Sequence, residues 1–333
     1  MKLKFVQIIL VVFIFAGCTH RQKIADLTVQ AAEAMAEENY EQAIKDYSEV
    51  IRLDSKFAPA YTARGDAFVI LGQYDKAIED LTESIRLNPT NYMAYQLRGA
   101  AYFANQRLDK AIGDLSTALD SHLVNEKFRG MALKMRGQSY YRTDSFTNAI
   151  ADLTEALKYL PDDYEIYEAR GDCYDRRTDA DKSLSDFNNA IRLNPEDAPA
   201  FYGRGSIYSR AGAYTSAIQD FEIVIKLKPK AFGAYNKLSW MLATCPDDQI
   251  RDGKRAIELA MKACDLSKWK KYAYVDTLAA AYAETGDFEQ AVKYQKQAAS
   301  MDGIPEDNRT NVQNRIELYL QHKPYRKSDK NYD

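Results

Sequence analysis

The sequence has few histidines, the side chains most often used in acid–base catalysis and metal binding, and they are widely spaced. The three histidines are His20, His122 and His322, which lie near the two ends and in the middle third of the 333 residues. The sequence contains no glycine-rich phosphate loop, no dinucleotide-binding turn and no paired Cys-x-x-Cys motif, so we expect no metal and no cofactor. We also expect no enzymatic activity. The alternative is an unrecognised acidic site around Asp172 and Asp175, and substituting these residues would then abolish an activity.

One cysteine near the N-terminus is positioned for covalent lipidation. Met1–Lys4 is a short basic region, Phe5–Phe15 is almost wholly apolar, and the small residues Ala16 and Gly17 then precede Cys18. An apolar run of this length is too short for a permanent membrane helix, which needs about 20 residues, and it fits the core of a signal peptide.

This segment resembles the lipobox of bacterial lipoproteins, in which the cysteine is acylated and becomes the first residue of the mature protein. Phe15 departs from that pattern, which usually has an aliphatic residue there. The resemblance implies a signal peptide at residues 1–17, palmitate or a related acyl group on Cys18, and a short lipidated tether at residues 18–23. Thr19 resembles the Gram-negative pattern of sorting to the outer membrane, so we expect an outer membrane lipoprotein that faces the periplasm. The alternatives are an uncleaved signal anchor and an ordinary secretory signal.

Opposite charges recur at a fixed spacing along the chain. Five arginines each precede a glycine, and an aspartate follows each of them sixteen residues later. In a hairpin of two antiparallel helices these positions face each other, so we predict five structural ion pairs among the site residues. The pairs are Arg64/Asp80, Arg98/Asp114, Arg136/Asp152, Arg170/Asp186 and Arg204/Asp220.

The last two units support the pairing, because they lack both charges. They have Leu238 with Leu259 and Leu278 with Tyr294 at these positions. Partly buried pairs would cost several kcal/mol to break on one side, whereas fully exposed pairs would contribute about 0–1 kcal/mol. An arginine row that binds an anion is the alternative.

The elements that place these pairs are copies of one unit. Aligned on the glycine, segments such as Tyr61–Phe68 (YTARGDAF) and Tyr167–Tyr174 (YEARGDCY) recur at steps of 34 residues, with one step of 38 near Leu123–Lys127. A small residue such as Ala77 follows twelve positions after the glycine, and a proline closes most units. Glycine inside a helix costs about 0.5–1 kcal/mol relative to alanine, so its recurrence indicates close contact between two helices. A fixed period of this length is typical of stacked helical hairpins.

The unit resembles the tetratricopeptide repeat, and the resemblance covers residues 24–301. It implies an all-α fold: a right-handed superhelical solenoid of about eight helical hairpins. The expected repeats are 24–57, 58–91, 92–129, 130–163, 164–197, 198–231, 232–271 and 272–301. A capping helix is expected at residues 302–322, where Val312, Ile316, Leu318 and Leu320 are apolar, followed by a polar tail without fixed structure at residues 323–333.

The net charge and the cysteines of the sequence argue against a nucleic acid partner and against an intramolecular disulfide. The net charge is −3 and no basic stripe follows the repeats, so we expect no nucleic acid partner. Besides Cys18 there are three cysteines, an odd number for a secreted chain. Cys245 and Cys264 should lie at distant levels of their hairpin, so we expect no intramolecular disulfide.

In the resembled family the first helix of each hairpin lines the concave face, and its outward positions contact ligands. The resemblance therefore implies partner-binding residues at fixed offsets from the glycines. They are Lys134, Gln138, Tyr141, Arg142, Glu168, Asp172, Asp175, Arg176, Tyr202, Ser206, Arg210, Asn236 and Trp240. Tyr, Trp and Arg dominate binding hot spots, and the mixture suits an extended peptide or helix with basic and aromatic residues. The alternative is an ordinary solvated helix face.

We therefore expect a non-enzymatic protein–protein interaction scaffold, anchored to the membrane through its lipid, that recruits a protein partner to the bacterial envelope. Bacterial relatives of this architecture serve as pilotins for secretins and as adaptors for cell-wall enzymes, so a pilotin-like assembly factor is one alternative. The other is a structural protein that forms a homodimer through its terminal repeats.

Overall fold

The computed structural model describes residues 20–120 and 125–327, and within these ranges every regular element is an α-helix. Cys18 and the expected signal peptide lie outside the described residues. A helical segment at residues 20–36 is followed by sixteen helices. They are α2 (Tyr40–Leu53), α3 (Ala58–Ile70), α4 (Tyr74–Leu87), α5 (Tyr92–Ala104), α6 (Leu108–Leu119), α7 (Glu126–Arg142), α8 (Phe146–Ala156), α9 (Tyr164–Arg176), α10 (Ala180–Leu193), α11 (Ala198–Arg210), α12 (Tyr214–Leu227), α13 (Phe232–Thr244), α14 (Gly253–Leu266), α15 (Tyr272–Glu284), α16 (Phe288–Ala299) and α17 (Glu306–Leu320). No helix of the described residues is long and apolar enough to cross a membrane.

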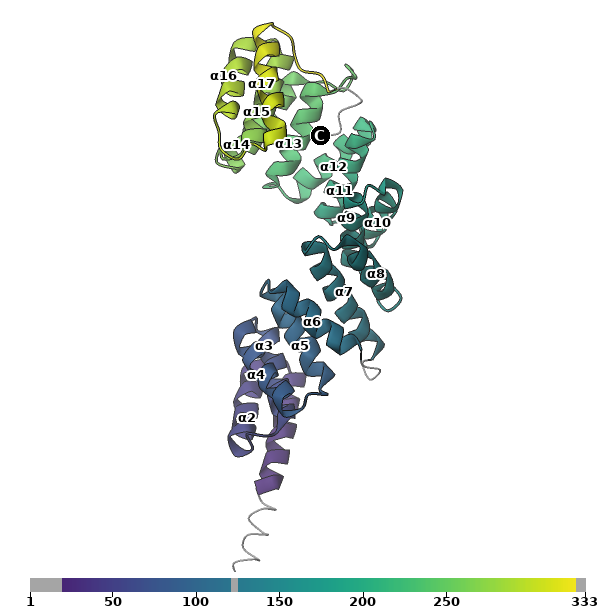
Figure 1. Ribbon diagram of the computed structural model, residues 1–333, viewed down its shortest axis with the longest axis vertical. Helices are drawn as coiled ribbons and strands as arrows, with labels where there is room; N and C mark the ends of the chain where they lie inside the picture. Colours follow the sequence, from purple (N-terminus) through teal and green to yellow (C-terminus); the bar gives the residue numbers. More distant parts are fainter. Residues whose placement is uncertain (1–19, 121–124, 328–333) are drawn as a thin grey trace, which may run out of the picture. The chain divides into compact units, whose positions relative to one another are not determined.

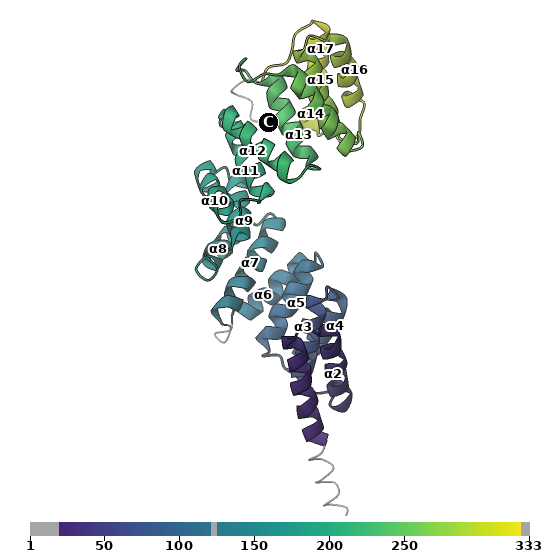
Figure 2. The ribbon, with the colours of Figure 1, turned by 180° about the vertical axis from the view of Figure 1, so that it is seen from behind.

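The helices pair in sequence order, and the chain forms two compact units. The N-terminal unit, Met1–Asp162, contains the helices through α8, and the C-terminal unit, Asp163–Asp333, contains α9 to α17. Within each unit the two helices of a hairpin are neighbours, and each hairpin packs on the next, as α4 does on α5 and α12 on α13 (Figures 1 and 2). The predicted fold class, an all-α repeat of stacked hairpins, is confirmed.

The recurring glycine marks the point where the two helices of a hairpin come closest. A Cβ added to Gly65 would lie 2.7 Å from Cγ of Leu81, and one added to Gly137 would lie 2.8 Å from Cγ of Leu153. Atoms at that separation overlap, so any side chain at these positions would push the helices apart. The leucines belong to the second helix of the same hairpin, which explains why glycine and the large residue recur together.

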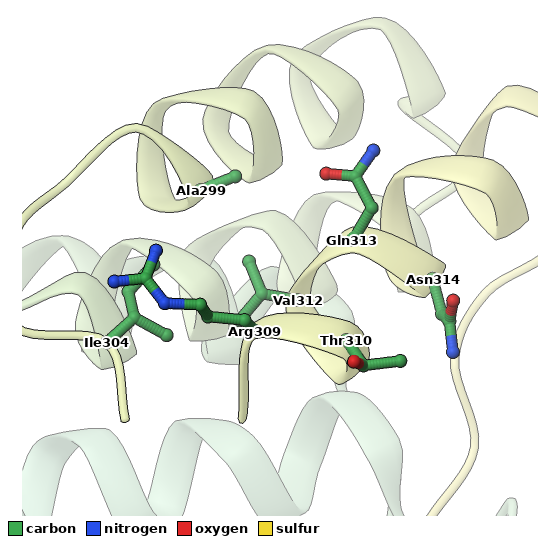
Figure 3. A pocket seen from close by; sticks show the side chains of 7 residues that line it. All are labelled: Ala299, Ile304, Arg309, Thr310, Val312, Gln313 and Asn314. Carbon is green, nitrogen blue, oxygen red and sulfur yellow. The ribbon is translucent and has the colours of Figure 1, made fainter. Parts of the chain in front are cut away.

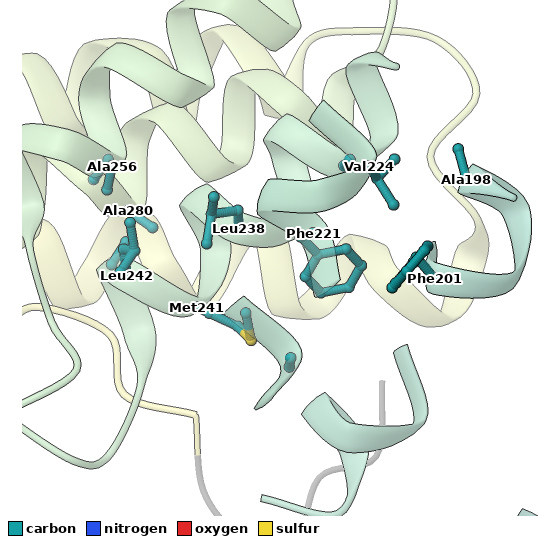
Figure 4. Close-up of a cluster of buried hydrophobic side chains, with 13 residues drawn as sticks. Ala198, Phe201, Phe221, Val224, Leu238, Met241, Leu242, Ala256 and Ala280 are labelled. Carbon is teal, nitrogen blue, oxygen red and sulfur yellow. The ribbon is translucent and has the colours of Figure 1, made fainter. Parts of the chain in front are cut away.

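Small residues on the second helices fill the centre of each hairpin. The positions twelve residues after the glycines are all fully buried. They are Ala77, Ala111, Ala149, Ser183 and Ala217. In the C-terminal unit aromatic and aliphatic side chains extend this core, and Figure 4 shows Phe201, Phe221 and Leu238 from α11, α12 and α13 in one cluster. Three cysteines, Cys173, Cys245 and Cys264, are buried and form no disulfide.

All five arginine–aspartate pairs form in the structure, each by two parallel hydrogen bonds. In every pair Nε donates to Oδ2 and Nη2 donates to Oδ1, at 2.7–2.9 Å. The arginine side chains are 16–20% exposed and the aspartates 4–12%. Aromatic rings flank the guanidinium groups, as Tyr95 and Tyr102 do for Arg98. Each pair therefore joins the two helices of one hairpin in a largely dehydrated setting.

The five aspartates of these pairs, which the sequence analysis assigned a structural role, all lie buried inside their hairpins. They are Asp80, Asp114, Asp152, Asp186 and Asp220. The reason is their place beside the large residue that packs on the glycine. A Cβ added to Gly205, for example, would lie 3.0 Å from Cβ of Asp220. Their contribution is therefore to the stability of each hairpin, and they occupy the two arginine nitrogens that an anion would need.

Four of these arginines also reach the preceding hairpin, which the sequence interpretation missed. The remaining Nη1 group of each of the four donates to a side-chain oxygen on the preceding second helix at 2.7–3.0 Å. The pairs are Arg64 with Ser48, Arg98 with Thr82, Arg136 with Ser116 and Arg204 with Asn188. A signal was present, because each acceptor lies two residues after the aspartate position of its own repeat. One guanidinium thus connects three helices.

The structure corrects two predicted boundaries in the N-terminal unit. The division between residues 129 and 130 falls inside α7, because α7 begins at Glu126. Asn125 caps this longer helix by accepting from the N–H of Phe128 at 2.9 Å, so part of the expected insertion forms an additional helical turn. The helical segment at residues 20–36 begins inside the tether predicted at residues 18–23, leaving His20 to Lys23 helical.

The C-terminal end is also more ordered than predicted. The capping helix is present as α17, which packs on α16 and buries Val312, Ile316 and Tyr319, whereas Leu320 is 59% exposed. The tail predicted to lack fixed structure instead packs on the helices at residues 323–327. The ring of Tyr325 packs against the ring of Trp240. The tail thus has aromatic and basic side chains that can contact the helices, which a purely polar segment would not have.

Candidate partner-binding pocket

The C-terminal unit contains a pocket of about 300 Å³ between the first helices of three successive hairpins and the C-terminal helix. Its lining comes from α11, α13, α15 and α17, with one residue of the following segment. The lining residues are Ser206, Ser209, Arg210, Asn236, Lys237, Trp240, Tyr272, Ala273, Asp276, Thr277, Asn308, Asn311, Val312, Arg315 and Lys327. This volume lies at the lower end of the range typical of ligand-binding pockets.

Helical periodicity brings these side chains together. Ser206 and Arg210 are four residues apart on α11, and Asn236 and Trp240 are four apart on α13, so each pair lies on one helix face. Because α11 and α13 are the first helices of consecutive hairpins, the stacking of the hairpins aligns these faces. The first helix of the next hairpin, α15, and α17 add their own polar faces to the lining.

Trp240 is partly covered by the chain's own C-terminal end, although it still lines the pocket. Its ring centroid lies 5.7 Å from that of Tyr325, and the guanidinium carbon of Arg315 lies 5.5 Å from the centroid of Trp240 and 5.3 Å from that of Tyr325. The main chain holds this segment in place as well, because Lys327 N–H donates to the carbonyl of Thr244 at 2.9 Å. The expected hot-spot tryptophan therefore contacts the chain's own C-terminal segment.

The acidic side chain of the lining, Asp276, is already satisfied. Arg315 donates to its two oxygens at 3.0 and 2.9 Å, and Nε2 of Gln295 donates to Oδ1 at 2.5 Å. Gln295 also donates to the carbonyl of Val312 at 3.1 Å, and all of these groups are buried. This network fixes α17 on α15 and α16 and leaves Asp276 little capacity to attract a further cation.

The remaining charges of the lining are positive. Among the described residues, Lys237 and Lys327 form no ion pair, whereas Arg210 pairs with Asp175 of α9. Burial lowers the pKa of Lys237 below its ordinary value, and the nearby charges of Lys327 and Arg210 lower it further, although part of this side chain remains exposed to solvent. The pocket therefore combines polar donors with an excess of positive charge in a chain of net charge −3.

The structure places the predicted partner-binding residues in different settings. Ser206, Arg210, Asn236 and Trp240 line the pocket together. Tyr202, also on α11, instead packs against Phe221 with ring centroids 5.6 Å apart.

The remaining predicted residues do not line this pocket. Four are on α9: Glu168, Asp172, Asp175 and Arg176. Four others are on α7, in the N-terminal unit: Lys134, Gln138, Tyr141 and Arg142.

Three of the predicted charged residues contact neighbouring hairpins of their own unit. Asp175 pairs with Arg210, so the acid and the base expected to meet a partner neutralise each other. Arg142 donates to Gln106 of the preceding hairpin, and its guanidinium carbon lies 5.5 Å from the ring centroid of Phe103. These side chains connect successive first helices.

Sequence reasoning missed the residues that α15, α17 and the C-terminal segment contribute. Asn308, Asn311 and Arg315 are spaced three and four apart, so they form one polar face of α17, and this spacing could have been read from the sequence. Lys237 adjoins the predicted Asn236. No signal marked Lys327, because nothing in the sequence indicated that the tail folds back.

A second hollow of about 370 Å³ lies at the outer end of the C-terminal unit, between α16 and α17 (Figure 3). Arg309 and Val312 of α17 face Ala299 of α16 there, with Ile304 from the connecting loop. Its one ionisable side chain, Arg309, pairs with Glu306 at 3.0 Å. The polar side chains of this hollow all come from the single helix α17, whereas those of the other pocket come from four helices, so the pocket between α11, α13, α15 and α17 is the better candidate site.

Comparisons with known proteins identify the class to which this fold belongs. The family model of the TPR repeat matches residues 65–106, and two models of the tetratricopeptide repeat match residues 28–79, 134–187 and 174–232, and residues 275–304. The chain is a tetratricopeptide-repeat protein, as its repeat pattern predicted. Searching the curated proteins gave no match.

Solved structures share the fold at low sequence identity. A tetratricopeptide repeat protein from Parabacteroides merdae is 16% identical with a TM-score of 0.50, and the match covers 90% of this chain and 99% of that one. YrrB, described as a TPR protein with an unusual peptide-binding site, is 20% identical with a TM-score of 0.51, and the match covers 57% of this chain and 96% of YrrB.

Proposed function

We propose that this protein is a non-enzymatic interaction scaffold that holds a segment of a partner protein in the pocket of its C-terminal unit. The observation that supports this most directly is the lining itself, in which side chains from three consecutive first helices converge with those of α17. Such an arrangement offers hydrogen-bond donors, charges and an aromatic ring along one path, as recognition of an extended peptide requires. The peptide-binding site ascribed to YrrB supports the same ligand class.

The chemistry of the pocket revises the kind of partner expected from sequence. The sequence suggested a partner with basic and aromatic residues, because acidic groups were expected on α9. Asp175 is paired with Arg210, and Asp276 with Arg315. The positive lysines of the lining favour an acidic partner segment instead.

We further propose that acyl chains on Cys18 hold the protein at the outer membrane, where it faces the periplasm. The support is the sequence of residues 1–18, with its basic start, apolar core and small residues before the cysteine. In this setting the scaffold would act as an adaptor or a pilotin-like assembly factor. Metabolic labelling with palmitate tests the anchor: label in the wild type and none in Cys18→Ser is expected, whereas an unlabelled wild type would contradict it.

Site-specific photocrosslinking in native membranes tests partner binding. A photoreactive amino acid at Ser209, inside the pocket, is compared with one at Lys262, exposed on α14 and away from the lining. A discrete adduct at Ser209 that is absent at Lys262 is expected, and charge reversal at Lys237 should remove it. The same adducts at both positions, or none at Ser209, would overturn the pocket as the binding site.

Homodimerisation through the ends is a second candidate, favoured by one observation. The two most exposed large apolar side chains are Val29, at 58%, and Leu320, at 59%, and they lie in the first and last helices of the described residues. Light scattering after size exclusion should then show a dimer that Leu320→Ser dissociates. A monomer at all concentrations would exclude this candidate.

A further inference from the structure

We propose that one edge of the C-terminal unit, formed by two consecutive turns between hairpins, contacts the anionic lipid headgroups of a membrane. This surface, called the lysine edge below, lies outside the pocket lining. It consists of Lys228 and Lys230 before α13, Lys268, Lys270 and Lys271 before α15, and Phe232 at the start of α13. The proposal goes beyond the proposed function, because it gives the chain a second contact with a bilayer besides the proposed acyl anchor on Cys18.

Hairpin stacking places the two turns next to each other. The helices α13 and α15 pack together as the first helices of consecutive hairpins (Figures 1 and 2). The ring centroid of Phe232, the first residue of α13, lies 5.9 Å from that of Tyr274, the third residue of α15. Both turns therefore open at the same edge of the unit. Their five lysines are exposed there around one aromatic side chain, Phe232, which is itself 41% exposed.

The turn before α15 has a defined conformation that leaves its lysines in solvent. Lys268 and Trp269 both have left-handed backbone angles, with φ of 55° and 57°, which residues other than glycine adopt at a cost. Contacts of Trp269 offset this cost. Its N–H donates to the carbonyl of Cys264 at 2.8 Å, and its ring stacks on that of Tyr294 with centroids 6.2 Å apart. The three lysines of the turn remain exposed on either side of this anchored ring.

No acidic side chain within the two turns neutralises the lysines. Residues 228–235 and 266–275 contain neither aspartate nor glutamate, and the five lysines form no ion pair with another described residue. The nearest acid along the chain, Asp265, accepts from the indole N–H of Trp269 at 3.0 Å. The lysine edge therefore concentrates positive charge on a chain whose net charge is −3.

The repeat pattern does not account for these lysines. The same turn reads NPTN at residues 88–91 and NPED at residues 194–197, so it is neutral or acidic in other copies. Each of these turns connects two helices of the same kind, so the fold leaves the charge at these positions open. A charge cluster that the fold does not require is explained by an interaction with something outside the chain.

The type of basic residue favours a lipid surface over an acidic protein. Where this chain binds a carboxylate through two parallel bonds it uses arginine, as in Arg64 with Asp80 and Arg315 with Asp276. Protein interfaces are likewise enriched in arginine and depleted in lysine. The lysine edge contains no arginine.

Lysines around an exposed aromatic ring are typical of membrane surfaces. Their ammonium groups meet lipid phosphates at the ends of long apolar stems, while the ring enters the headgroup layer. Each lysine near an anionic bilayer favours the bound state by about fivefold, so the five together support a stable contact. This attraction is screened by salt.

Trp269 can report the contact, because Trp240→Phe leaves it as the single tryptophan of the chain. This variant of the full chain, purified in detergent, is reconstituted on vesicles that contain phosphatidylcholine with a nitroxide on its headgroup, which quenches a nearby indole. One set is otherwise phosphatidylcholine, and the other contains about one third phosphatidylglycerol. We expect quenching on the anionic vesicles that disappears in about 1 M salt, and little on the neutral ones. Equal quenching on both sets, or none on either, would overturn the proposal.

Charge removal with a matched control locates the contact. Replacing all five lysines of the lysine edge by Gln should lower quenching on anionic vesicles to the level of the neutral ones. The control replaces five exposed lysines of the N-terminal unit by Gln and should keep the quenching of the parent. They are Lys45, Lys56, Lys76, Lys110 and Lys127. Circular dichroism verifies that both variants fold. Equal losses in the two variants would show that only net charge matters, and would overturn the lysine edge as the contact.

Crosslinking distinguishes a lipid from an acidic protein as the occupant. A photoreactive amino acid in place of Phe232 should form lipid adducts in native membranes. A discrete protein adduct there, with no quenching on vesicles, would assign the edge to an acidic protein and overturn the lipid contact. The anchor is tested separately: quenching with an unlabelled Cys18 would reject the anchor and retain the lysine edge, whereas a labelled Cys18 without quenching would do the reverse.

Discussion

Arg315 and Asp276 form a bidentate ion pair between α17 and α15, although they are 39 residues apart in the sequence. Nε donates to Oδ1 at 3.0 Å and Nη2 to Oδ2 at 2.9 Å, and the two side chains are only 8% and 9% exposed. The last hairpin lacks the recurring pair inside it, since Leu278 and Tyr294 occupy those positions. Instead, a buried ion pair joins this hairpin to the helix that covers it.

Replacing Arg315 by Met should therefore destabilise the C-terminal unit by about 3–5 kcal/mol, because Asp276 would be left as a buried charge without its counter-ion. Urea unfolding followed by tryptophan fluorescence measures this, since both tryptophans lie in the C-terminal unit. The Trp240 emission should also shift to longer wavelength as Tyr325 loses its support. A loss below about 1 kcal/mol, the range of surface pairs, would show that the pair is not desolvated in solution.

The repeated pairs can be tested at Arg136 and Asp152 in the N-terminal unit. Arg136→Leu should cost several kcal/mol, because it strands a mostly buried carboxylate, whereas the double variant with Asp152→Leu should recover most of that loss. Recovery should be incomplete by about 1 kcal/mol, since Ser116 loses its bond from Nη1 of Arg136. Circular dichroism during thermal unfolding gives the comparison. Equal losses in the single and double variants would refute the coupling.

Two glycines should respond in opposite directions to the same substitution. A Cβ on Gly203 would lie 2.4 Å from Cζ of Phe187, whose ring has no flexible end that can move away. Gly203→Ala should therefore destabilise by about 1–3 kcal/mol. The control is Gly113→Ala in α6, where nothing lies within 4 Å, so the helix should gain about 0.5–1 kcal/mol. Thermal midpoints that shift in the same direction would contradict this contact.

Asp197 should make the C-terminal unit less stable as pH rises. It caps α11 by accepting from the N–H of Ala200 at 3.3 Å, but its Oδ2 atom is buried without a partner, and burial raises the pKa of this carboxyl. Below the ordinary aspartate pKa of about 3.9 both states are protonated and nothing is lost. Above it the unfolded chain ionises first, so stability falls until the raised folded-state pKa is passed.

Asp197→Asn retains an acceptor for the cap and removes that loss. Its thermal midpoint should exceed that of the wild type near neutral pH, and the two should converge in acid. The protein already has an asparagine at the equivalent N-cap position of α5. There Asn91 accepts a hydrogen bond from the N–H of Ala94 and donates hydrogen bonds to Thr62 and Ser84. A variant destabilised equally at both pH values would contradict this prediction, because it would show that ionisation of Asp197 does not change the stability of the unit.

The fold could be predicted from the sequence because the repeats constrain it many times over. Each glycine is matched by a large residue sixteen positions later, and each arginine by an aspartate, so several independent copies indicate one hairpin geometry. Non-repeated parts had no such support. The additional turn of α7 begins at a local cap by Asn125, and the C-terminal segment docks through the contact of Tyr325 with Trp240; neither contact belongs to the repeated pattern.

The candidate site was predictable only in part for the same reason. Ser206, Arg210, Asn236 and Trp240 lie at repeat positions, and the offsets from the glycines found them. Arg315 and Lys327 lie outside the repeats, so no offset applied. Asp175 was placed on the right helix, but its pairing with Arg210 of the next repeat became visible only in three dimensions.

The contact that four of these arginines make with the preceding hairpin has an evolutionary consequence. Since Ser48, Thr82, Ser116 and Asn188 occupy the same place in their copies, any one of them presents a suitable acceptor to the arginine that follows. A gene duplication or loss of one whole copy would therefore join hairpins that already fit. The number of hairpins can therefore change by recombination without any new contact between hairpins. Selection can then act on the length of the scaffold.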